Sequence, residues 1–295
     1  MMPRVKNMEI SSIAEQLFFT TVRIETENDS ESGVGTGTLF NYKSNAQSYP
    51  FIVTNKHVVS GAKKGKFTFI KSSNGKPLFG LTVEIDLTDF EDYWYGHSSK
   101  DVDIAIMPLG PLLQIIKDRG DEIFYRPINN DVVPSKDTLS KLDAIEDVVF
   151  VGYPTGIWDS KNKLPVIRRG ITASPLQIDY EAKKQFLVDA SVFPGSSGSP
   201  VFLYNAGSYH DKEGGLVVGS RLYFLGIIAM VFYISEKNEI QHGAIPTKKS
   251  FSISKQMVDL GVVFKTSAIL ETMDSFLKDC ENKDWRDVCS KDSLS

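Results

Sequence analysis

Most of the chain consists of short apolar or alternating runs of the kind that form β-strands. They are rich in β-branched and aromatic residues, and clusters of Gly, Asn, Ser and Pro separate them. The runs are Phe18–Glu25, Thr36–Asn41, Phe51–Thr54, Lys66–Lys71, Leu78–Asp86, Asp103–Pro108, Val148–Tyr153, Val166–Ala173, Gln185–Ala190, Pro200–Tyr204 and Arg221–Ile234. About a dozen strands with no regular helices between them favour antiparallel barrels over alternating strand–helix units.

Two segments near the ends of the chain predict helices. Residues 8–17 predict a short one. In 266–279 the apolar residues Ile269, Met273 and Leu277 recur every four positions, as in an amphipathic helix packed on a core. We divide the chain into an N-terminal helix and extension (1–17), a first β-barrel (18–115), a connection (116–145), a second β-barrel (146–265) and a C-terminal helix and tail (266–295).

The composition is that of a globular protein. Hydrophobic residues make up 41% of the 295 residues and charged residues 24%, enough to build a sizeable core. The net charge is −4 and the isoelectric point about 5.7, so nothing in the charge balance favours binding to a nucleic acid.

Three features of the sequence predict that the protein resides in the cytoplasm. Glu9 and Glu15 interrupt the N-terminal segment, which therefore lacks the apolar core of a signal peptide. The longest apolar run, Phe224–Ile234, is far shorter than the roughly 20 residues that span a bilayer. Cysteines occur only at 280 and 289, and this scarcity favours a reducing compartment. We expect two free thiols there, with a disulfide or a metal pair as the alternative.

The segment Phe193–Phe202 has the residues that a nucleophilic serine requires. Such a serine needs a tight turn that exposes its hydroxyl and directs backbone N–H groups at the developing oxyanion. Gly195 and Gly198 flank Ser197 and allow such a turn, and a strand follows at once. The same composition also fits an ordinary Gly/Ser-rich loop, so this segment alone does not identify an enzyme.

A histidine and a carboxylate follow other predicted strands. His57 comes after the buried run Ile52–Thr54, while the remaining histidines (97, 210 and 242) lie in polar, glycine-containing stretches that predict surface loops. Asp101 and Asp103 are two positions apart and share a strand face. We select Asp103, since it adjoins the buried run, and keep Asp101 as the alternative.

In the order His57, Asp103, Ser197, these segments resemble the trypsin-like serine peptidases, and in particular the protease domains of the bacterial HtrA type. Other matching motifs are Gly33–Gly37, Val149–Pro154, Arg169–Ser174, Asp189–Ser191, Leu225–Ala229 and Leu260–Thr266. The resemblance covers residues 18–279. It implies an all-β, chymotrypsin-like fold of two six-stranded antiparallel β-barrels with a C-terminal helix.

The resemblance also implies a role for each site residue. Ser197 is the expected nucleophile, His57 the base and Asp103 the carboxylate that orients the histidine. The backbone N–H groups of Gly195 and Ser197 are expected to form the oxyanion hole. No metal or organic cofactor is implied.

The expected substrate pocket has Ser191 at its base and Ala229 and Val231 along its wall. A pocket with no carboxylate at its base predicts cleavage after small or aliphatic residues, not after Arg or Lys. The run of glycines at 33, 35 and 37 could also suggest a nucleotide loop, but no helix pattern and no P-loop lysine follow it.

Some positions depart from the family pattern. Trypsin has an aspartate just before its serine, which receives the N-terminus freed on zymogen activation, whereas this chain has Ser196 and no activation sequence. We therefore expect no proteolytic maturation. About thirty residues follow the last predicted strand, too few for the PDZ domains of HtrA enzymes, so the oligomeric state and regulation of that group do not carry over.

The expected partner is a protein or peptide substrate, with neither nucleic acid nor membrane involved. Two other functions stay open. The chain could be a catalytically silent or partner-gated peptide-binding module with an intact triad. It could also be an esterase, but α/β-hydrolases have the order Ser, Asp, His and alternate strands with helices.

Overall fold

The computed structural model describes residues 8–154, 157–240 and 250–282, and the side chains of residues 230–240 and 250–257 lie outside this description. Its helices are α1 (Ile13–Leu17), α2 (Lys56–Val59), α3 (Gly110–Asp118), α4 (Lys136–Ser140) and α5 (Thr266–Asn282), with 3₁₀ turns η1 (Phe90–Tyr93), η2 (Asn130–Val132) and η3 (Tyr180–Ala182). Its strands are β1 (Thr21–Glu27), β2 (Ser32–Ser44), β3 (Gln47–Thr54), β4 (Lys64–Ser73), β5 (Lys76–Thr88), β6 (Tyr95–Gly96), β7 (Ala105–Pro108), β8 (Ile128–Asn129), β9 (Asp147–Gly152), β10 (Val166–Thr172), β11 (Gln185–Asp189), β12 (Pro200–Asn205), β13 (Ser208–His210), β14 (Leu216–Val218), β15 (Arg221–Ile240) and β16 (Ser250–Lys265).

The N-terminal half is a curled antiparallel sheet. Over the described residues its eight strands follow the order β5-β4-β1-β2-β3-β7-β6, and β8 pairs in parallel with β2. The β2–β3 hairpin turns at Asn45 and Ala46, both with positive φ as a tight two-residue hairpin turn requires. Val22, Ile52 and Phe67 belong to the buried core of this half. The described strands trace an open path, so the closed first barrel that the sequence predicted is not confirmed.

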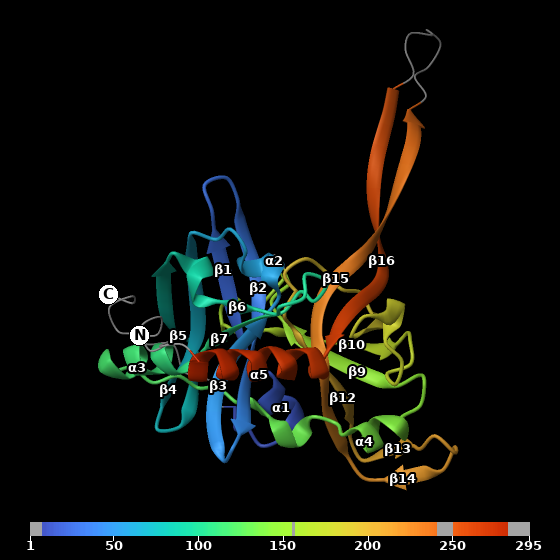
Figure 1. Ribbon diagram of the computed structural model, residues 1–295, viewed down its shortest axis with the longest axis horizontal. Helices are drawn as coiled ribbons and strands as arrows, with labels where there is room; N and C mark the ends of the chain where they lie inside the picture. Colours follow the sequence, from blue (N-terminus) through green and yellow to red (C-terminus); the bar gives the residue numbers. More distant parts are fainter. Residues whose placement is uncertain (1–7, 155–156, 241–249, 283–295) are drawn as a thin grey trace.

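The C-terminal half is a closed barrel. Among the described residues, its six strands run β10-β11-β16-β15-β12-β9, which confirms the barrel predicted for this part of the fold. Its core includes Phe150, Phe186 and Val263. The hairpin of β15 and β16 extends far beyond the barrel (Figure 1), whereas the sequence predicted a strand only as far as Ile234.

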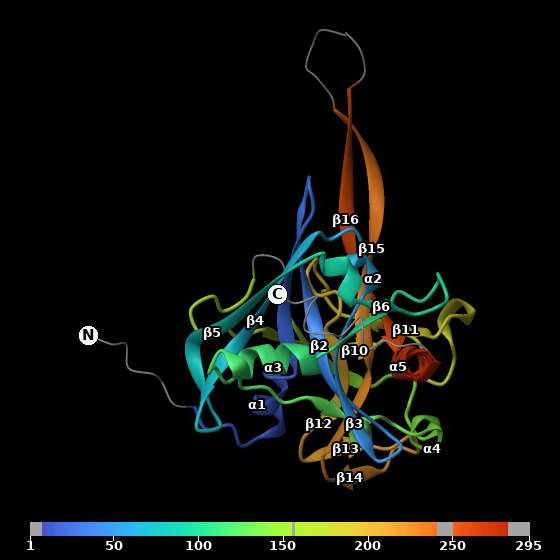
Figure 2. The same ribbon diagram turned by 60° about the vertical axis from the view of Figure 1, so that its left-hand side comes forward.

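The two halves share one apolar core. Phe40 and Phe51 from the first half pack in the same cluster as Phe202 and Phe224 from the second. Helix α5, predicted from the sequence for 266–279, leaves β16 and crosses to the first half (Figure 1), and Figure 2 views it nearly end-on. Phe276 of this helix stacks edge-on against Phe51 of β3. The helix therefore braces the N-terminal sheet against the barrel.

Helix α3 was not predicted from the sequence, where no regular helix was expected between the strands. Pro111 occupies its first turn, where a missing N–H costs nothing. Leu112 and Ile116, four positions apart, face the core of the N-terminal half.

No helix in the described part of the chain is long and apolar enough to cross a membrane. Cys280 lies half-buried on α5, and Cys289 lies outside the described residues.

Two tyrosines connect α5 to the N-terminal sheet. The Tyr42 hydroxyl on β2 donates to Asp274 at 2.5 Å, and the Tyr95 hydroxyl on β6 donates to Asp279 at 2.8 Å. Burial, and then hydrogen bonding to the carboxylate, raise the pKa of Tyr42 and of Tyr95 to about 12. Each phenol therefore keeps its proton in the folded protein over a pH range in which it loses it on unfolding.

This raised pKa predicts an alkaline loss of stability. As pH rises from about 10 towards 12, the unfolded state releases phenol protons that the folded state retains, so the free energy of unfolding falls. The double variant Tyr42→Phe/Tyr95→Phe should be about 2 kcal/mol less stable at about pH 8 and should lose less stability above that pH than wild type. Urea unfolding followed by circular dichroism measures both. Tyr49→Phe is the control, because among the described residues that hydroxyl donates to Gln47 of its own hairpin and not to α5. An unchanged pH slope in the double variant would contradict the assignment.

Candidate active site

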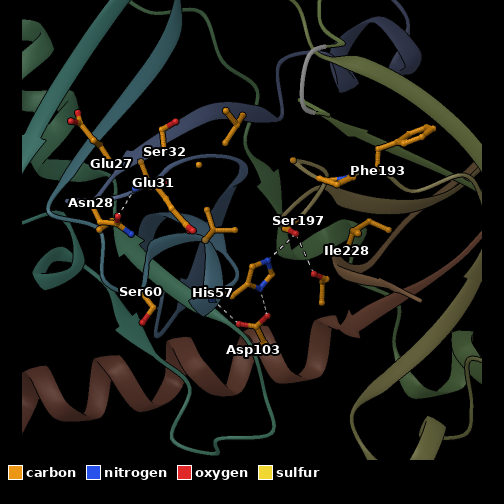
Figure 3. A pocket seen from close by; sticks show the side chains of 18 of the residues that line it. Glu27, Asn28, Glu31, Ser32, His57, Ser60, Asp103, Phe193, Ser197 and Ile228 are labelled. Carbon is orange, nitrogen blue, oxygen red and sulfur yellow. Dashed lines mark hydrogen bonds and ion pairs between the residues drawn. The ribbon is translucent and has the colours of Figure 1, made fainter. Parts of the chain in front are cut away.

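A cleft of about 660 Å³ opens between the two halves. Glu27, Asn28, Glu31 and Ser32 line it from the β1–β2 hairpin (Figure 3). The second half contributes residues of the segment before β12 and of β15. The cleft reaches Ser197 and His57, and a second cavity of about 930 Å³ adjoins His57 on its other side.

His57, Asp103 and Ser197 meet at the floor of this cleft. Asn55 and α2 turn the chain after β3 and bring His57 over the loop that precedes β7. His57 Nδ1 lies 2.5 Å from Asp103 Oδ2, and His57 Nε2 lies 3.0 Å from Ser197 Oγ (Figure 3). The backbone N–H of His57 also donates to Asp103 Oδ1 at 3.0 Å. The three side chains selected from the sequence thus form one hydrogen-bonded chain.

The two candidate carboxylates lie in different surroundings. Asp101 is exposed, 3.9 Å from Lys183 Nζ, whereas Asp103 contacts the histidine. Burial raises the pKa of the Asp103 carboxyl, but its hydrogen bonds and charge interaction with His57 outweigh burial and hold this pKa below its usual value. Asn55, fully buried, donates its side-chain amide to the Asp103 carbonyl at 2.7 Å. Asp103 is therefore an ionised carboxylate in a fixed position.

The segment before β12 forms the tight turn expected around Ser197. The Ser196 N–H donates to the Phe193 carbonyl at 3.0 Å, and Gly195 has φ +86°. Proline followed by a glycine with positive φ is typical of a type II turn. Among the described residues, the N–H groups of Gly195 and Ser197 donate to no protein acceptor, so both are free to bind an oxyanion in the cleft.

Gly198 cannot be replaced without moving the neighbouring strand. Its φ is +85°, and a Cβ there would lie 1.9 Å from the Thr36 carbonyl oxygen. Its own carbonyl accepts from the Thr38 hydroxyl at 2.7 Å. The glycine therefore allows the serine turn to approach β2 closely.

Thr36 of β2 is the main anchor of the serine turn. Its N–H donates to the Ser197 carbonyl at 2.9 Å and its hydroxyl to the Gly195 carbonyl at 3.0 Å. The same hydroxyl accepts from the Tyr153 N–H and from the Ser199 hydroxyl. From the sequence, Thr36 was expected only to begin a strand (Thr36–Asn41) at the end of the glycine run, and a polar residue among glycines and apolar positions was the one available signal.

Lys56 anchors the loop on the other side of the site. Its ammonium donates to the carbonyls of His97, at 2.5 Å, and Ser99, at 2.9 Å. Burial lowers the Lys56 pKa, with the charge of Asp103 opposing this. The loop that leads to Asp103 is therefore held by the residue before His57. No sequence signal predicts this contact, because it depends on how two loops meet.

The residues predicted for the substrate pocket are not all brought together. Ala229 lines the cleft, and its carbonyl accepts from the Ser197 hydroxyl at 3.2 Å. Ser191 is half-buried and does not line the cleft, whereas its neighbour Val192 does. The side chain of Val231 lies outside the described residues.

A metal site requires several ligating side chains close together. No group of three His, Cys, Asp or Glu side chains among the described residues could hold a metal ion. His97, expected in a surface loop, is half-buried, with Nε2 3.7 Å from a carboxylate oxygen of Glu271.

Comparison with known proteins identifies one family. The family model described as "Trypsin-like peptidase domain" matches residues 35–208. The chain is 27% identical over 270 residues to "Serine protease HtrA-like" of Staphylococcus aureus strain USA300. That match covers 86% of this chain but 29% of the relative, so the chain spans less than a third of the length of this curated relative.

The chain is also similar to solved protease structures. The "HtrA-type protease AlgW with tripeptide" is 15% identical, with a TM-score of 0.48, over 90% of this chain and 62% of that chain. The serine endoprotease from Yersinia pestis is 15% identical, with a TM-score of 0.47, over 92% of this chain and 69% of that chain.

The anchoring by Thr36 can be tested by removing its hydroxyl. Thr36→Val preserves the shape but leaves the buried Gly195 carbonyl, Tyr153 N–H and Ser199 hydroxyl without this partner. We expect a loss of about 2–4 kcal/mol in the free energy of unfolding and a fall in labelling of Ser197 by a fluorophosphonate. Thr36→Ser, which keeps the hydroxyl, should retain most of both. Full stability in Thr36→Val would mean that the turn is held elsewhere.

Proposed function

Because the chain belongs to the trypsin-like peptidase family, we propose that it is a serine endopeptidase that acts through His57, Asp103 and Ser197. The observation that carries the proposal is the hydrogen-bonded chain from Asp103 through His57 to Ser197. It ends beside two backbone N–H groups that have no protein acceptor among the described residues. A nucleophile, its base and an electrophilic site therefore meet at one point of the cleft.

The proposed reaction has two steps. His57 Nε2 removes the proton of the Ser197 hydroxyl as Ser197 Oγ attacks the peptide carbonyl, and the imidazolium then gives that proton to the leaving amine. Asp103, ionised and bonded to Nδ1, stabilises the imidazolium and fixes which nitrogen faces the serine. Water, deprotonated by the same histidine, then hydrolyses the acyl-enzyme and restores Ser197.

The negative charge on the substrate oxygen requires donors that are already in place. The N–H groups of Gly195 and Ser197 are proposed to bind it, because the turn leaves both free towards the cleft. Each such donor contributes roughly 3–4 kcal/mol to transition-state stabilisation in known enzymes of this kind. No solvent reorganisation is needed at the moment of reaction.

Two cavities support cleavage within a chain rather than at its end. The cavities of about 660 and 930 Å³ lie on either side of His57 and Asp103 and share both residues. An extended peptide can therefore pass the nucleophile with residues on both sides of the scissile bond. Peptide and protein substrates are the proposed partners.

The proposed preference before the cut is for small or aliphatic side chains. Ser191, Ala229 and Val231 remain the proposed pocket residues, and none of them is acidic. Val192 supports an apolar pocket, since its apolar side chain lines the cleft. Gly261 packs closely against it: a Cβ at Gly261 would lie 2.8 Å from a methyl carbon of Val192.

The protein is further proposed to need no proteolytic maturation. Ser196, at the position that carries the aspartate in trypsin, is buried and has no charge to receive a freed N-terminus. The turn is held instead by Thr36. A reducing compartment, proposed to be the cytoplasm, agrees with the two cysteines of the chain.

A catalytically silent peptide-binding module is the alternative function, and triad variants decide between them. Ser197→Ala, His57→Ala and Asp103→Asn should each lower peptidase turnover by roughly 10⁴-fold, and the losses should not add, because the three residues act as a unit. Steady-state kinetics on a peptide mixture measures this. Asp101→Asn is the matched control, and a loss from Asp101→Asn equal to that from Asp103→Asn would show that the wrong carboxylate was chosen. Wild type that neither cleaves peptides nor reacts with a fluorophosphonate would support the silent module.

Cleavage-site profiling tests the specificity. A peptide library read by mass spectrometry should show cuts after Ala, Val, Leu or Met, with discrimination of about 1–3 kcal/mol per misplaced methylene. The Ser197→Ala variant gives the background. Dominant cleavage after Arg or Lys would show that an acidic side chain reaches the pocket and that the proposed pocket residues are wrong.

Intact-mass measurement tests the maturation proposal. Protein labelled at Ser197 by a fluorophosphonate should have the mass of the full expressed chain plus one probe. If only an N-terminally shortened form carries the label, maturation is required after all.

A further inference from the structure

The turn that presents the Gly195 N–H is held at its two ends by different elements. Thr36 of β2 binds the Gly195 carbonyl. At the other end, the ring of Phe193 lies against Arg168 of β10, with the guanidinium carbon 4.6 Å from the ring centroid. This distance is typical of a cation–π contact. No charged group of the turn itself takes part.

The guanidinium of Arg168 is not fully hydrogen-bonded in its surroundings. It is half-buried, and its Nη1 atom is buried without a hydrogen-bond partner among the described residues. Burial lowers the Arg168 pKa, with the charge of Asp259 opposing this. A buried donor that bonds nothing costs stability, so the side chain has no evident role in strengthening its own strand. Its close contact is with Phe193, and a second ring, that of Phe150, lies at 5.7 Å.

The sequence of the turn does not by itself determine its conformation. Proline at the second position is compatible with both type I and type II turns, and glycine at the third accepts φ of either sign. Rotation of the Pro194–Gly195 peptide would interconvert the two types. It would direct a carbonyl, not the Gly195 N–H, at the oxyanion. The closing bond from the Ser196 N–H to the Phe193 carbonyl exists in both types and does not prevent the rotation.

We propose that Arg168 is a positioning residue that holds the Phe193–Ser196 turn in its oxyanion-binding conformation through the ring of Phe193. This inference rests on the proposed peptidase function. The contact supplies, from within the barrel, a restraint that an ion pair at the buried Ser196 position cannot supply here. Arg168 is not among the described residues that line the cleft, so its proposed effect on the reaction passes through the turn.

Kinetics of paired variants test the contact. Arg168→Gln removes the cation and Phe193→Leu removes the ring. Each should lower kcat about tenfold, because the competent fraction of molecules falls. Arg168→Gln should do so with KM unchanged, whereas Phe193 itself lines the cleft, so its variants are compared by kcat alone. The double variant should have a kcat no lower than either single variant, and Phe193→Tyr, which keeps a ring, should have a higher kcat than Phe193→Leu. Arg169→Gln is the matched control on the same strand, since Arg169 is exposed and pairs with Asp147.

Two further measurements separate positioning from general stability. The melting temperature of Arg168→Gln should stay close to that of wild type, because the change also removes an unpaired buried donor. Affinity for a peptide boronate, whose tetrahedral adduct needs the oxyanion hole, should fall with kcat, while affinity for the same peptide as an amide should not. A rise in the KM of Arg168→Gln, additive losses of kcat in the double variant or an equal effect of Arg169→Gln would overturn the proposal.

A readout without catalysis keeps this inference distinct from the proposed function. Relaxation dispersion of the Gly195 backbone ¹⁵N should show slow exchange in Arg168→Gln and none in wild type. If wild type fails to cleave peptides or to react with a fluorophosphonate, the peptidase function is wrong, yet the Gly195 measurement still decides whether Arg168 holds the turn. Identical dispersion in the two proteins would refute the positioning role.

Discussion

The site depends above all on one buried hydroxyl, that of Thr36. It donates to the turn before Ser197 and accepts from the chain just after β9, so a strand of the first half fixes two segments of the second. Because the group is fully buried, loss of any of these bonds leaves a polar atom with no water to replace its partner. The position of Ser197 relative to the half that carries His57 is therefore set by hydrogen bonds at the junction itself.

Close approach at this junction requires residues without side chains. A Cβ at Gly152 would lie 1.9 Å from the Ser199 hydroxyl oxygen, and one at Gly198 would meet the Thr36 carbonyl at the same distance. Away from the junction, larger apolar residues and α5 hold the halves together. The shared core and the helix hold the two halves together, while the glycines and threonines at the junction set the geometry of the site.

The sequence predicted those parts of the molecule whose signals are local. The strands and α5 follow from periodicity, while the six-stranded barrel of the second half and the order of His57, Asp103 and Ser197 followed from the resemblance to a known family. Contacts between distant segments left no such signal. Thr36 appeared only as the start of a predicted strand within a glycine-rich run, and the contact of Phe193 with Arg168 depends on the pairing of β10 with β11, the strand that precedes Phe193. Helix α3 was missed because its short apolar repeat lies within an Asp- and Pro-rich region, and the long β15–β16 hairpin because its outer half is polar.

Placing a neutral residue at 196 changes the electrostatics of the nucleophile turn. A buried ion pair costs desolvation of both charges and is lost when either partner is protonated or absent. Here the turn is held by hydroxyl and backbone groups on one side and by the face of an aromatic ring on the other, and none of these titrates near neutral pH. At Asp103, hydrogen bonds and the charge interaction with His57 hold the carboxyl pKa below its usual value and so keep the charge beside the histidine in place. In the proposed mechanism, proton transfer at His57 would leave the N–H groups of Gly195 and Ser197 undisturbed, because the restraint on the turn and the carboxylate beside the histidine come from different parts of the fold.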